Sequence, residues 1–307
     1  MTEAQAKLIV WFRNHASAQD AAGNRERALK VILGAVETAR RQVNLEAGEG
    51  RHLFAVLLDA GVLALHSQKN GVAKSLLNES LALAENGSVE LTSEELAETR
   101  QRLGVAMDNQ GDEEGAAEQF EICLELLTNL ENPPLDSLAH LANNLGMIRR
   151  NQARFDESAS LYRQAQDIFE SMGDSHALDL ATVCNNQGSL FWAWNQQELA
   201  RDFHLVSLKL RMDHLPPGHP DIGQSACNLA AVYHELGDLE KARRNYERAL
   251  AILKRHLSED PDTYEIAARN FADLLTQSGH PQKAEKFLRV ADKRIARARS
   301  QLDQANS

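Results

Sequence analysis

The stretch VYHELGDLEKA at residues 232–242 decides the fold, because the chain repeats its pattern at a constant interval of 42 residues. Gly237 ends the first half of this pattern, with the small residue Ala230 seven positions before it and Ala242 five positions after it. The equivalent turn residues in the other copies are Gly111, Ala153, Asn195 and Gly279. A period held over five copies indicates a repeat architecture.

Each copy is predicted to form two helices joined by a short turn. Around Gly237 we expect a first helix over residues 224–236 and a second over 239–256. Apolar and small residues recur in both segments at spacings of three and four, which places them on one face of a helix. These stripes comprise Ala226, Leu229, Ala230 and Tyr233 in the first helix and Ala242, Tyr246, Ala249 and Leu250 in the second.

One helix pair cannot bury its apolar stripes alone, so successive pairs are expected to stack. The predicted fold class is an all-α, right-handed α-solenoid of about seven helix-turn-helix repeats. We expect one solenoid over residues 1–307, with two degenerate repeats in 1–94 and five regular repeats in 95–293. Residues 294–307 would form the basic end of the last helix and a tail. One degenerate copy, at residues 58–77, is one position out of step.

Helix-breaking residues fall between the copies, as the repeat model requires. We expect an aspartate to cap each first helix that follows such a breaker. The breakers are Pro133, Pro134, Pro216, Pro217, Pro220 and Pro261, and the expected caps are Asp136, Asp221 and Asp262.

The composition restricts the class of function. The 307 residues carry a net charge of -11, which disfavours nucleic acid as a partner because such binders usually carry a basic footprint. Three scattered cysteines make neither a disulfide framework nor a zinc site, and they fit a reducing compartment. The apolar runs are too short for a signal peptide or a membrane span. We therefore expect a cytoplasmic protein.

The repeat residues resemble those of a known family. With the turn residue as position 15, the copy around Gly237 has Leu229 at position 7, small residues at positions 8 and 20 and Tyr246 at position 24. This pattern resembles the tetratricopeptide repeat (TPR). The 42-residue period, the phrase PPGHPD at 216–221 and the Asn-Asn-Leu-Gly segment are similar to the kinesin-light-chain subclass, although His204 and Gln187 depart from its pattern.

The resemblance implies a function as well as a fold. Members of this family are adaptors that hold peptides or proteins and carry out no chemistry of their own. Kinesin-light-chain-like proteins also occur in bacteria, some beside bacterial tubulins. The resemblance therefore implies a non-enzymatic scaffold, and a tubulin-like filament as one possible partner.

Asparagines recur on the face of the first helix opposite the packed stripe, which is expected to line a concave groove. Position 6 holds Asn144, Asn186, Asn228 and Asn270, and position 5 adds Asn143 and Asn185. An amide has both donors and an acceptor, so such a column can pair with the backbone of an extended peptide. The alternative is that the amides hydrogen-bond between neighbouring first helices and make the stack rigid.

Position 12 of the same face adds Arg150, Trp192 and His234. Trp192 is a candidate aromatic anchor for a partner, or it is partly buried against the next repeat. Arg150 and His234 are candidates for meeting a partner carboxylate, or they are simply solvated side chains. Trp194 shares the phase of the packed stripe and is expected in the core.

The last helix is basic and has an apolar stripe. We expect its cations either to keep the terminal repeat in solution or to contact an acidic polymer or an anionic membrane. This contact would make the protein a structural adaptor, the alternative to groove binding. The candidate residues are Lys283, Lys286, Arg289, Lys293, Arg294 and Arg297.

No enzyme motif emerges from the sequence. GNRERALK at residues 23–30 lacks the features of a phosphate-binding loop, and HExxH does not occur. His214 and His219 lie in a proline-rich connector without a third metal ligand. Cys184 and Cys227 fit small buried apolar residues better than nucleophiles. We expect no catalytic residue, no metal and no cofactor.

Overall fold

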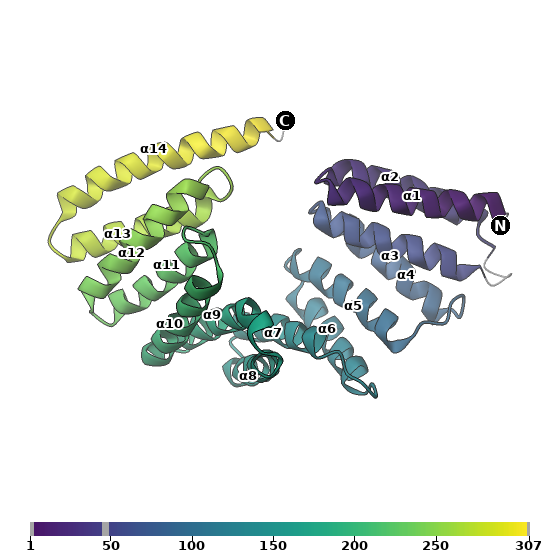
Figure 1. The fold of residues 1–307 in the computed structure, drawn as a ribbon, viewed down its shortest axis with the longest axis horizontal. Coiled ribbons are helices and arrows are strands. Elements are labelled where there is room, and N and C mark those ends of the chain that lie inside the picture. Colours follow the sequence, from purple (N-terminus) through teal and green to yellow (C-terminus); the bar gives the residue numbers. More distant parts are fainter. Residues whose placement is uncertain (1–2, 45–48, 306–307) are drawn as a thin grey trace. The chain divides into compact units, whose positions relative to one another are not determined.

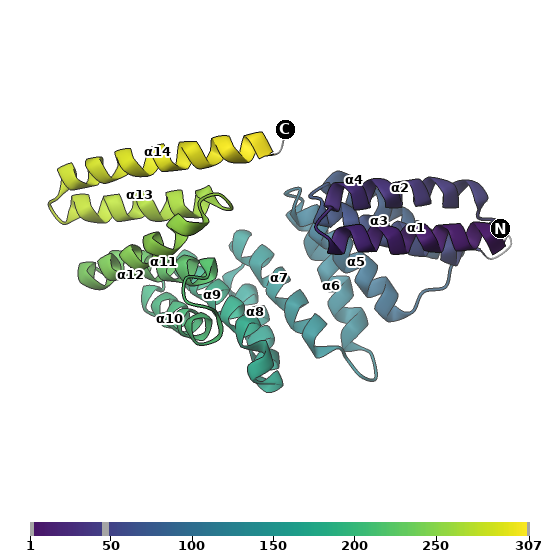
Figure 2. The same cartoon turned by 45° about the horizontal axis from the view of Figure 1, so that its top comes forward.

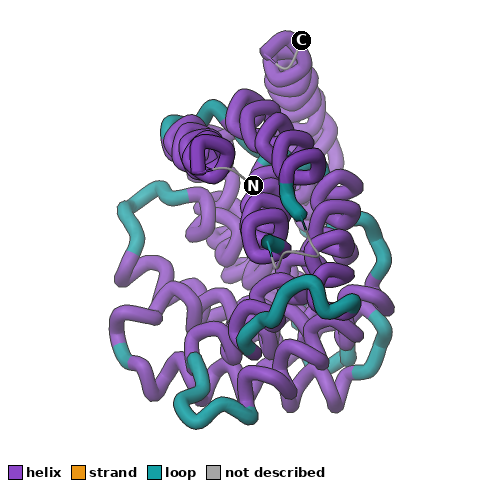
Figure 3. Tube along the Cα trace, turned by 90° about the vertical axis from the view of Figure 1, so that its right-hand side faces the viewer, coloured by secondary structure: helices purple, strands orange, loops and turns teal. Residues whose placement is uncertain are grey.

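The computed structural model describes residues 3–44 and 49–305, which form fourteen α-helices and two short 3-10 helices (Figure 1). No residue in these ranges lies in a β-strand, as the trace in Figure 3 shows. The structure therefore confirms the all-α fold class. The α-helices are α1 (Glu3–Ala21), α2 (Arg25–Gln42), α3 (Gly50–His66), α4 (Asn70–Glu85), α5 (Ser93–Asp108), α6 (Glu113–Thr128), α7 (Leu135–Asn151), α8 (Phe155–Met172), α9 (Ala177–Ala193), α10 (Gln197–His214), α11 (Pro220–Glu235), α12 (Leu239–Leu253), α13 (Pro261–Gln277) and α14 (Pro281–Ala305).

The chain divides into two compact units, residues 1–148 and residues 149–307. In the first unit α1 packs on α2, α3 on α4 and α5 on α6, and in the second α9 packs on α10, α11 on α12 and α13 on α14 (Figure 2). These antiparallel pairs agree with about seven helix-turn-helix repeats. The boundaries at residues 94 and 293 stay predictions.

The residue that follows the first helix has the same backbone conformation in every regular repeat. The φ angles of Gly111, Ala153, Asn195, Gly237 and Gly279 lie between 57° and 80°, in the left-handed region. Glycine adopts this region without a steric penalty, whereas a residue with a Cβ does not. These are the five positions that recur every 42 residues in the sequence. The period therefore arises from one turn that each repeat contains.

Backbone hydrogen bonds close this turn in the same way each time. The N–H of Asp238 donates to the carbonyl of Tyr233 at 2.9 Å, and the N–H of Gly237 donates to that of His234 at 3.1 Å. This pair of bonds is a Schellman motif, which ends the first helix. Gln68, with φ 57°, repeats the turn 43 residues before Gly111, which confirms the copy that is one position out of step.

The small residue at position 8 allows a large side chain to pack against the first helix. A Cβ added to Gly104 would lie 2.6 Å from the ring of Phe120, and one added to Gly188 would lie 2.7 Å from the imidazole of His204. Both pairs join position 8 to position 24. The histidine that departs from the repeat pattern therefore occupies the place of the expected aromatic ring, fully buried.

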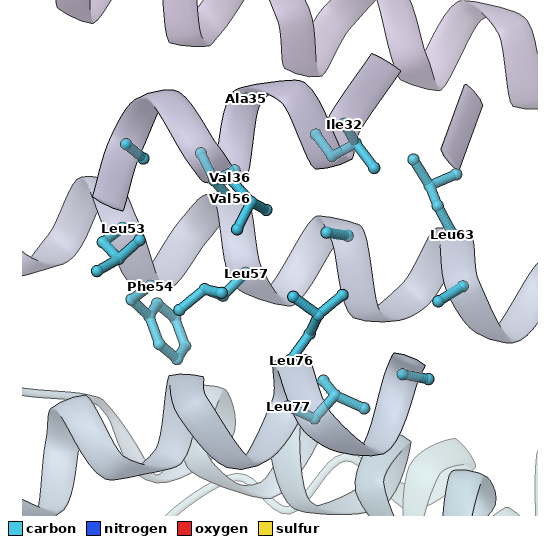
Figure 4. Packing of buried hydrophobic residues seen from close by; sticks show 14 of the residues in the cluster. Ile32, Ala35, Val36, Leu53, Phe54, Val56, Leu57, Leu63, Leu76 and Leu77 are labelled. Atoms are coloured by element: carbon cyan, nitrogen blue, oxygen red, sulfur yellow. The ribbon is translucent and has the colours of Figure 1, made fainter. Parts of the chain in front are cut away.

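The core of the first unit is a continuous layer of aliphatic side chains. Ile32 and Val36 of α2 lie above Val56 and Leu57 of α3, with Leu77 of α4 below (Figure 4). All five side chains are buried. Burial of this apolar area is the main favourable term in the stability of the stack.

The caps of two first helices differ from the sequence prediction. We expected Asp221 and Asp262 to cap α11 and α13, but His219 and Asp260 hold these positions. The helices begin one residue before each predicted cap, at Pro220 and Pro261, because proline has a suitable fixed φ and no N–H to satisfy at the first helical position. The third expected cap, Asp136, likewise lies inside the first turn of α7.

Candidate functional site

Three first helices of the second unit, α9, α11 and α13, bring part of the asparagine column together. α11 contacts both α9 and α13. Asn186, Asn228 and Asn270 occupy equivalent positions on these helices, and all three side chains are half-buried. In the first unit, Asn143 and Asn144 lie on α7, where the amide nitrogen of Asn143 lies 3.4 Å from the amide oxygen of Asn144.

One pair of amides bridges two neighbouring first helices. Asn228 Nδ2 on α11 donates a hydrogen bond of 2.9 Å to Asn185 Oδ1 on α9. Asn185 is buried, so its oxygen needs a partner within the protein. For this pair the structure supports the second of the two predicted roles, in which the amides hydrogen-bond between neighbouring first helices and hold the stack together.

A hollow of about 440 Å³ lies on the same three helices, and we call it the Trp192 hollow. It contains three of the residues predicted from sequence, one on each of the three first helices: Trp192, His234 and Asn270. Its other lining residues are Ala231, Glu235, Tyr246, Asp273 and Gln277. The repeat positions of these residues predicted a common face. In the structure all three residues line one cavity.

Contacts within the hollow fix the position of His234. One ring nitrogen, Nε2, lies 3.0 Å from Gln277 Oε1 on α13 and can donate to it. The imidazole also meets the ring of Tyr246 edge-on, with centroids 6.4 Å apart. Burial raises the pKa of the Tyr246 phenol, so this side chain is neutral at physiological pH. His234 and Tyr246 thus form an aromatic wall of the hollow, and these contacts hold the His234 ring in one orientation.

The charged groups at the hollow are two exposed carboxylates, Glu235 and Asp273. Across residues 3–44 and 49–305, no lysine, arginine or histidine forms a salt bridge with either of them. Together with the indole of Trp192, they provide an environment that suits a cationic side chain. Neither residue was predicted from sequence, although their repeat positions, 13 for Glu235 and 9 for Asp273, share the face of Trp192, His234 and Asn270 and could have identified them.

Two other predicted positions lie away from these contacts. Arg150 donates a hydrogen bond of 3.0 Å to the side-chain oxygen of Asn151, its neighbour on α7. Trp194 is half-buried at the end of α9, where it stacks on Phe191 at 6.1 Å and lies 5.8 Å from Phe155. The indole at 194 therefore packs among aromatic rings but is only half-buried, whereas the helical phase predicted it in the core.

The six basic residues of α14 that were predicted as surface contacts all have exposed side chains. These are Lys283, Lys286, Arg289, Lys293, Arg294 and Arg297. The apolar stripe of the same helix is covered, since Ala284, Ala291 and Ile295 are buried and α14 packs along α13. The stripe is thus explained by docking on the preceding helix. Contact of the cations with an acidic polymer or an anionic membrane stays a prediction.

The cysteines have the character of buried apolar residues. Cys123, Cys184 and Cys227 are free and buried, and burial raises the pKa of each thiol to about 12. A thiol with so high a pKa is a poor nucleophile at neutral pH. Within the described ranges, no group of three or more His, Cys, Asp and Glu side chains is arranged to hold a metal ion, and no helix has the length and apolarity to cross a bilayer.

Comparison with known proteins agrees with the repeat geometry. The tetratricopeptide repeat model matches residues 137–213 and 221–291. The chain is a TPR protein. Its TPR helix pairs supply the stacked first helices on which the Trp192 hollow is built.

Two relatives of this TPR protein carry informative names. BtubC (BKLC) from P. vanneervenii is 26% identical, and the match covers 74% of this chain and 90% of BtubC with a TM-score of 0.61. Protein KINESIN LIGHT CHAIN-RELATED 2 of Arabidopsis thaliana is 25% identical over 171 residues, or 55% of this chain. The match spans only 25% of the Arabidopsis protein. The apo form of RapI, 14% identical with a TM-score of 0.70 over 94% of this chain and 77% of RapI, shares the fold.

Proposed function

We propose that this TPR protein is a non-enzymatic scaffold that binds a segment of a partner protein at the Trp192 hollow. The observation that supports this function most directly is the convergence of Trp192, His234 and Asn270 on one cavity. Tryptophan in a partly enclosed site is a frequent anchor of protein interfaces. The amide of Asn270 supplies a donor and an acceptor for the backbone of an extended segment.

The charges of the hollow define the chemistry of the segment. Glu235 and Asp273 favour a lysine or arginine side chain of the partner, with its cation over the indole of Trp192. The earlier prediction that Arg150 and His234 meet a carboxylate would require the opposite charge. The half-buried Asn186 would extend the binding surface of the second unit along α9.

A synthetic peptide library tests this function. Peptides that bind the full-length chain are measured again by fluorescence polarisation against Trp192→Ala, Asn270→Ala and the matched surface control Lys286→Ala. We expect the first two substitutions to weaken binding by about tenfold or more, as for an interface anchor, and the control to leave it unchanged. Equal binding to wild type and Trp192→Ala, or a selection of peptides rich in Asp and Glu, would contradict the proposal.

A tubulin-like filament is the more specific candidate for the partner. The similarity to BtubC over 90% of that protein and to a kinesin light chain-related protein supports this candidate. Co-sedimentation with polymerised bacterial tubulin tests it. Binding by the wild-type chain that is lost in Trp192→Ala would support a cytoskeletal adaptor, whereas a chain that stays in the supernatant would exclude this partner.

A further inference from the structure

A second hollow of the second unit lies between the connector that follows α12 and the last helix, α14. It has a volume of about 290 Å³, and we call it the basic cleft. Four of its lining residues are cations, namely Lys254 and Arg255 from the short 3-10 helix Lys254–His256 and Arg294 and Arg297 from α14. The other four are Leu257, Ser258, Ala298 and Gln301. None of these residues lines the Trp192 hollow.

The cations of the basic cleft differ from the neighbouring arginines of the same helix. Arg289 pairs with Glu285 at 3.2 Å, and Arg299 lies 2.7 Å from Glu265 and also pairs with Asp262. No carboxylate of the described residues forms a salt bridge with Lys254, Arg255, Arg294 or Arg297. Four such cations around one cleft are unexpected in a chain with a net charge of -11.

Concentration of positive charge raises the local potential and attracts an anion. A single carboxylate carries one charge and would neutralise only one of the four cations. A phosphomonoester carries about −1.5 to −2 charges at pH 7 and three acceptor oxygens. Guanidinium groups bind such oxygens in a bidentate manner, so the three arginines suit a phosphoryl group.

We propose that the basic cleft binds a phosphorylated serine or threonine segment of a partner protein. The lining contains no aromatic ring on which a nucleotide base could stack. A flat bilayer would contact Lys283, Lys286 and other exposed cations of α14 as readily as those in the cleft. A phosphate on a flexible segment can enter the cleft, whose lining supplies the four cations.

The test uses the full-length chain and a fluorescein-labelled Gly/Ala peptide with two adjacent phosphoserines, followed by fluorescence polarisation at physiological salt. The same peptide with serines and the same peptide with glutamates serve as the other two arms. We expect saturable binding of the phosphopeptide only. Since charge-assisted hydrogen bonds are lost, Arg294→Gln with Arg297→Gln should weaken it by about tenfold or more.

The matched control is Lys283→Gln with Lys286→Gln, which removes the same charge from the same helix outside the cleft. We expect less than about a threefold change in this variant, because exposed cations contribute little beyond their direct contacts. All substituted side chains are exposed, and circular dichroism checks that both variants fold. Equal loss in both variants, equal binding of the glutamate peptide, or competition by phosphatidylinositol-phosphate vesicles that equals that of the phosphopeptide would overturn the proposal.

Discussion

Asn228 on α11 donates its amide hydrogen to the amide oxygen of Asn185 on α9, 43 residues earlier, across a distance of 2.9 Å. This bond connects position 6 of one repeat to position 5 of the preceding one. It gives Asn228 a role in holding the helices together, whereas Asn270 lines the Trp192 hollow at the equivalent position of the next repeat. The same residue type thus has two different surroundings in one column.

The two asparagines should respond differently to truncation. Asn228→Ala leaves the buried oxygen of Asn185 without its donor, and we expect it to lower the free energy of unfolding by about 1–3 kcal/mol. Asn270→Ala should cost less than about 1 kcal/mol because its amide faces the hollow. Urea denaturation of both variants followed by circular dichroism measures this difference, and equal losses would show that the Asn228–Asn185 bond contributes nothing measurable.

The repeat could be predicted from the sequence because the left-handed turn and the close helix contacts restrict which residue types can occupy their positions. Glycine at 237 and small residues at 188 and 230 are required by a left-handed turn and by helix contacts, so they recur at a fixed period. The prediction of Asp221 and Asp262 as caps is wrong, because Pro220 and Pro261 are the first residues of their helices and His219 and Asp260 precede them as caps.

The candidate site was harder to predict than the fold. Helical phase identified Trp192, His234 and Asn270, which do meet. It placed Glu235 and Asp273 on the same face but gave no reason to select them, since exposed carboxylates are common on any helix. The pairing of Asn228 with Asn185 depends on the offset between two helices, which a single sequence does not specify.

Substitutions at two equivalent positions of the repeated left-handed turn, Gly237 and Ala153, should change the stability in opposite directions. Gly237→Ala should lower the free energy of unfolding by about 1 kcal/mol, because its φ of 78° strains a residue with a Cβ while no atom lies close enough to clash. Ala153→Gly, at φ 57°, should raise it by a similar amount. Thermal denaturation of both variants checks the signs, and destabilisation by Ala153→Gly would contradict this account of the turn.

Gly188 is required for packing rather than for backbone conformation. A methyl group at this position would lie 2.7 Å from the His204 ring, so we expect Gly188→Ala to destabilise the chain by about 1–3 kcal/mol through overpacking. The matched control is Gly34→Ala on the exposed face of α2, where no atom lies within 4 Å of the added methyl. There the better helix propensity of alanine should give about 0.5–1 kcal/mol of stabilisation. Denaturant titration compares the two, and destabilisation of equal size would refute the packing argument.

His204 should make the stability depend on pH. Burial, with a smaller contribution from the nearby cation of Arg211, lowers the pKa of His204 to about 4 in the folded chain. The unfolded chain binds this proton near pH 6.5, so stability is fully present above that pH and falls as the pH drops to about 4. The loss should reach up to about 3 kcal/mol. In His204→Phe this part of the pH dependence should vanish, and urea titrations between pH 4 and 7 test it.

Because the turns share one geometry, we expect that a whole 42-residue repeat can be removed or added between two of them. Asn195 and Gly237 have nearly the same φ, 59° and 78°, and each follows the same pair of backbone hydrogen bonds. Excision of the 42 residues from one of these positions to the other would join segments that already share a conformation. We therefore expect gain or loss of a whole module by duplication or deletion to be tolerated at the tips of the hairpins, where no neighbouring atom crowds the junction at Gly237.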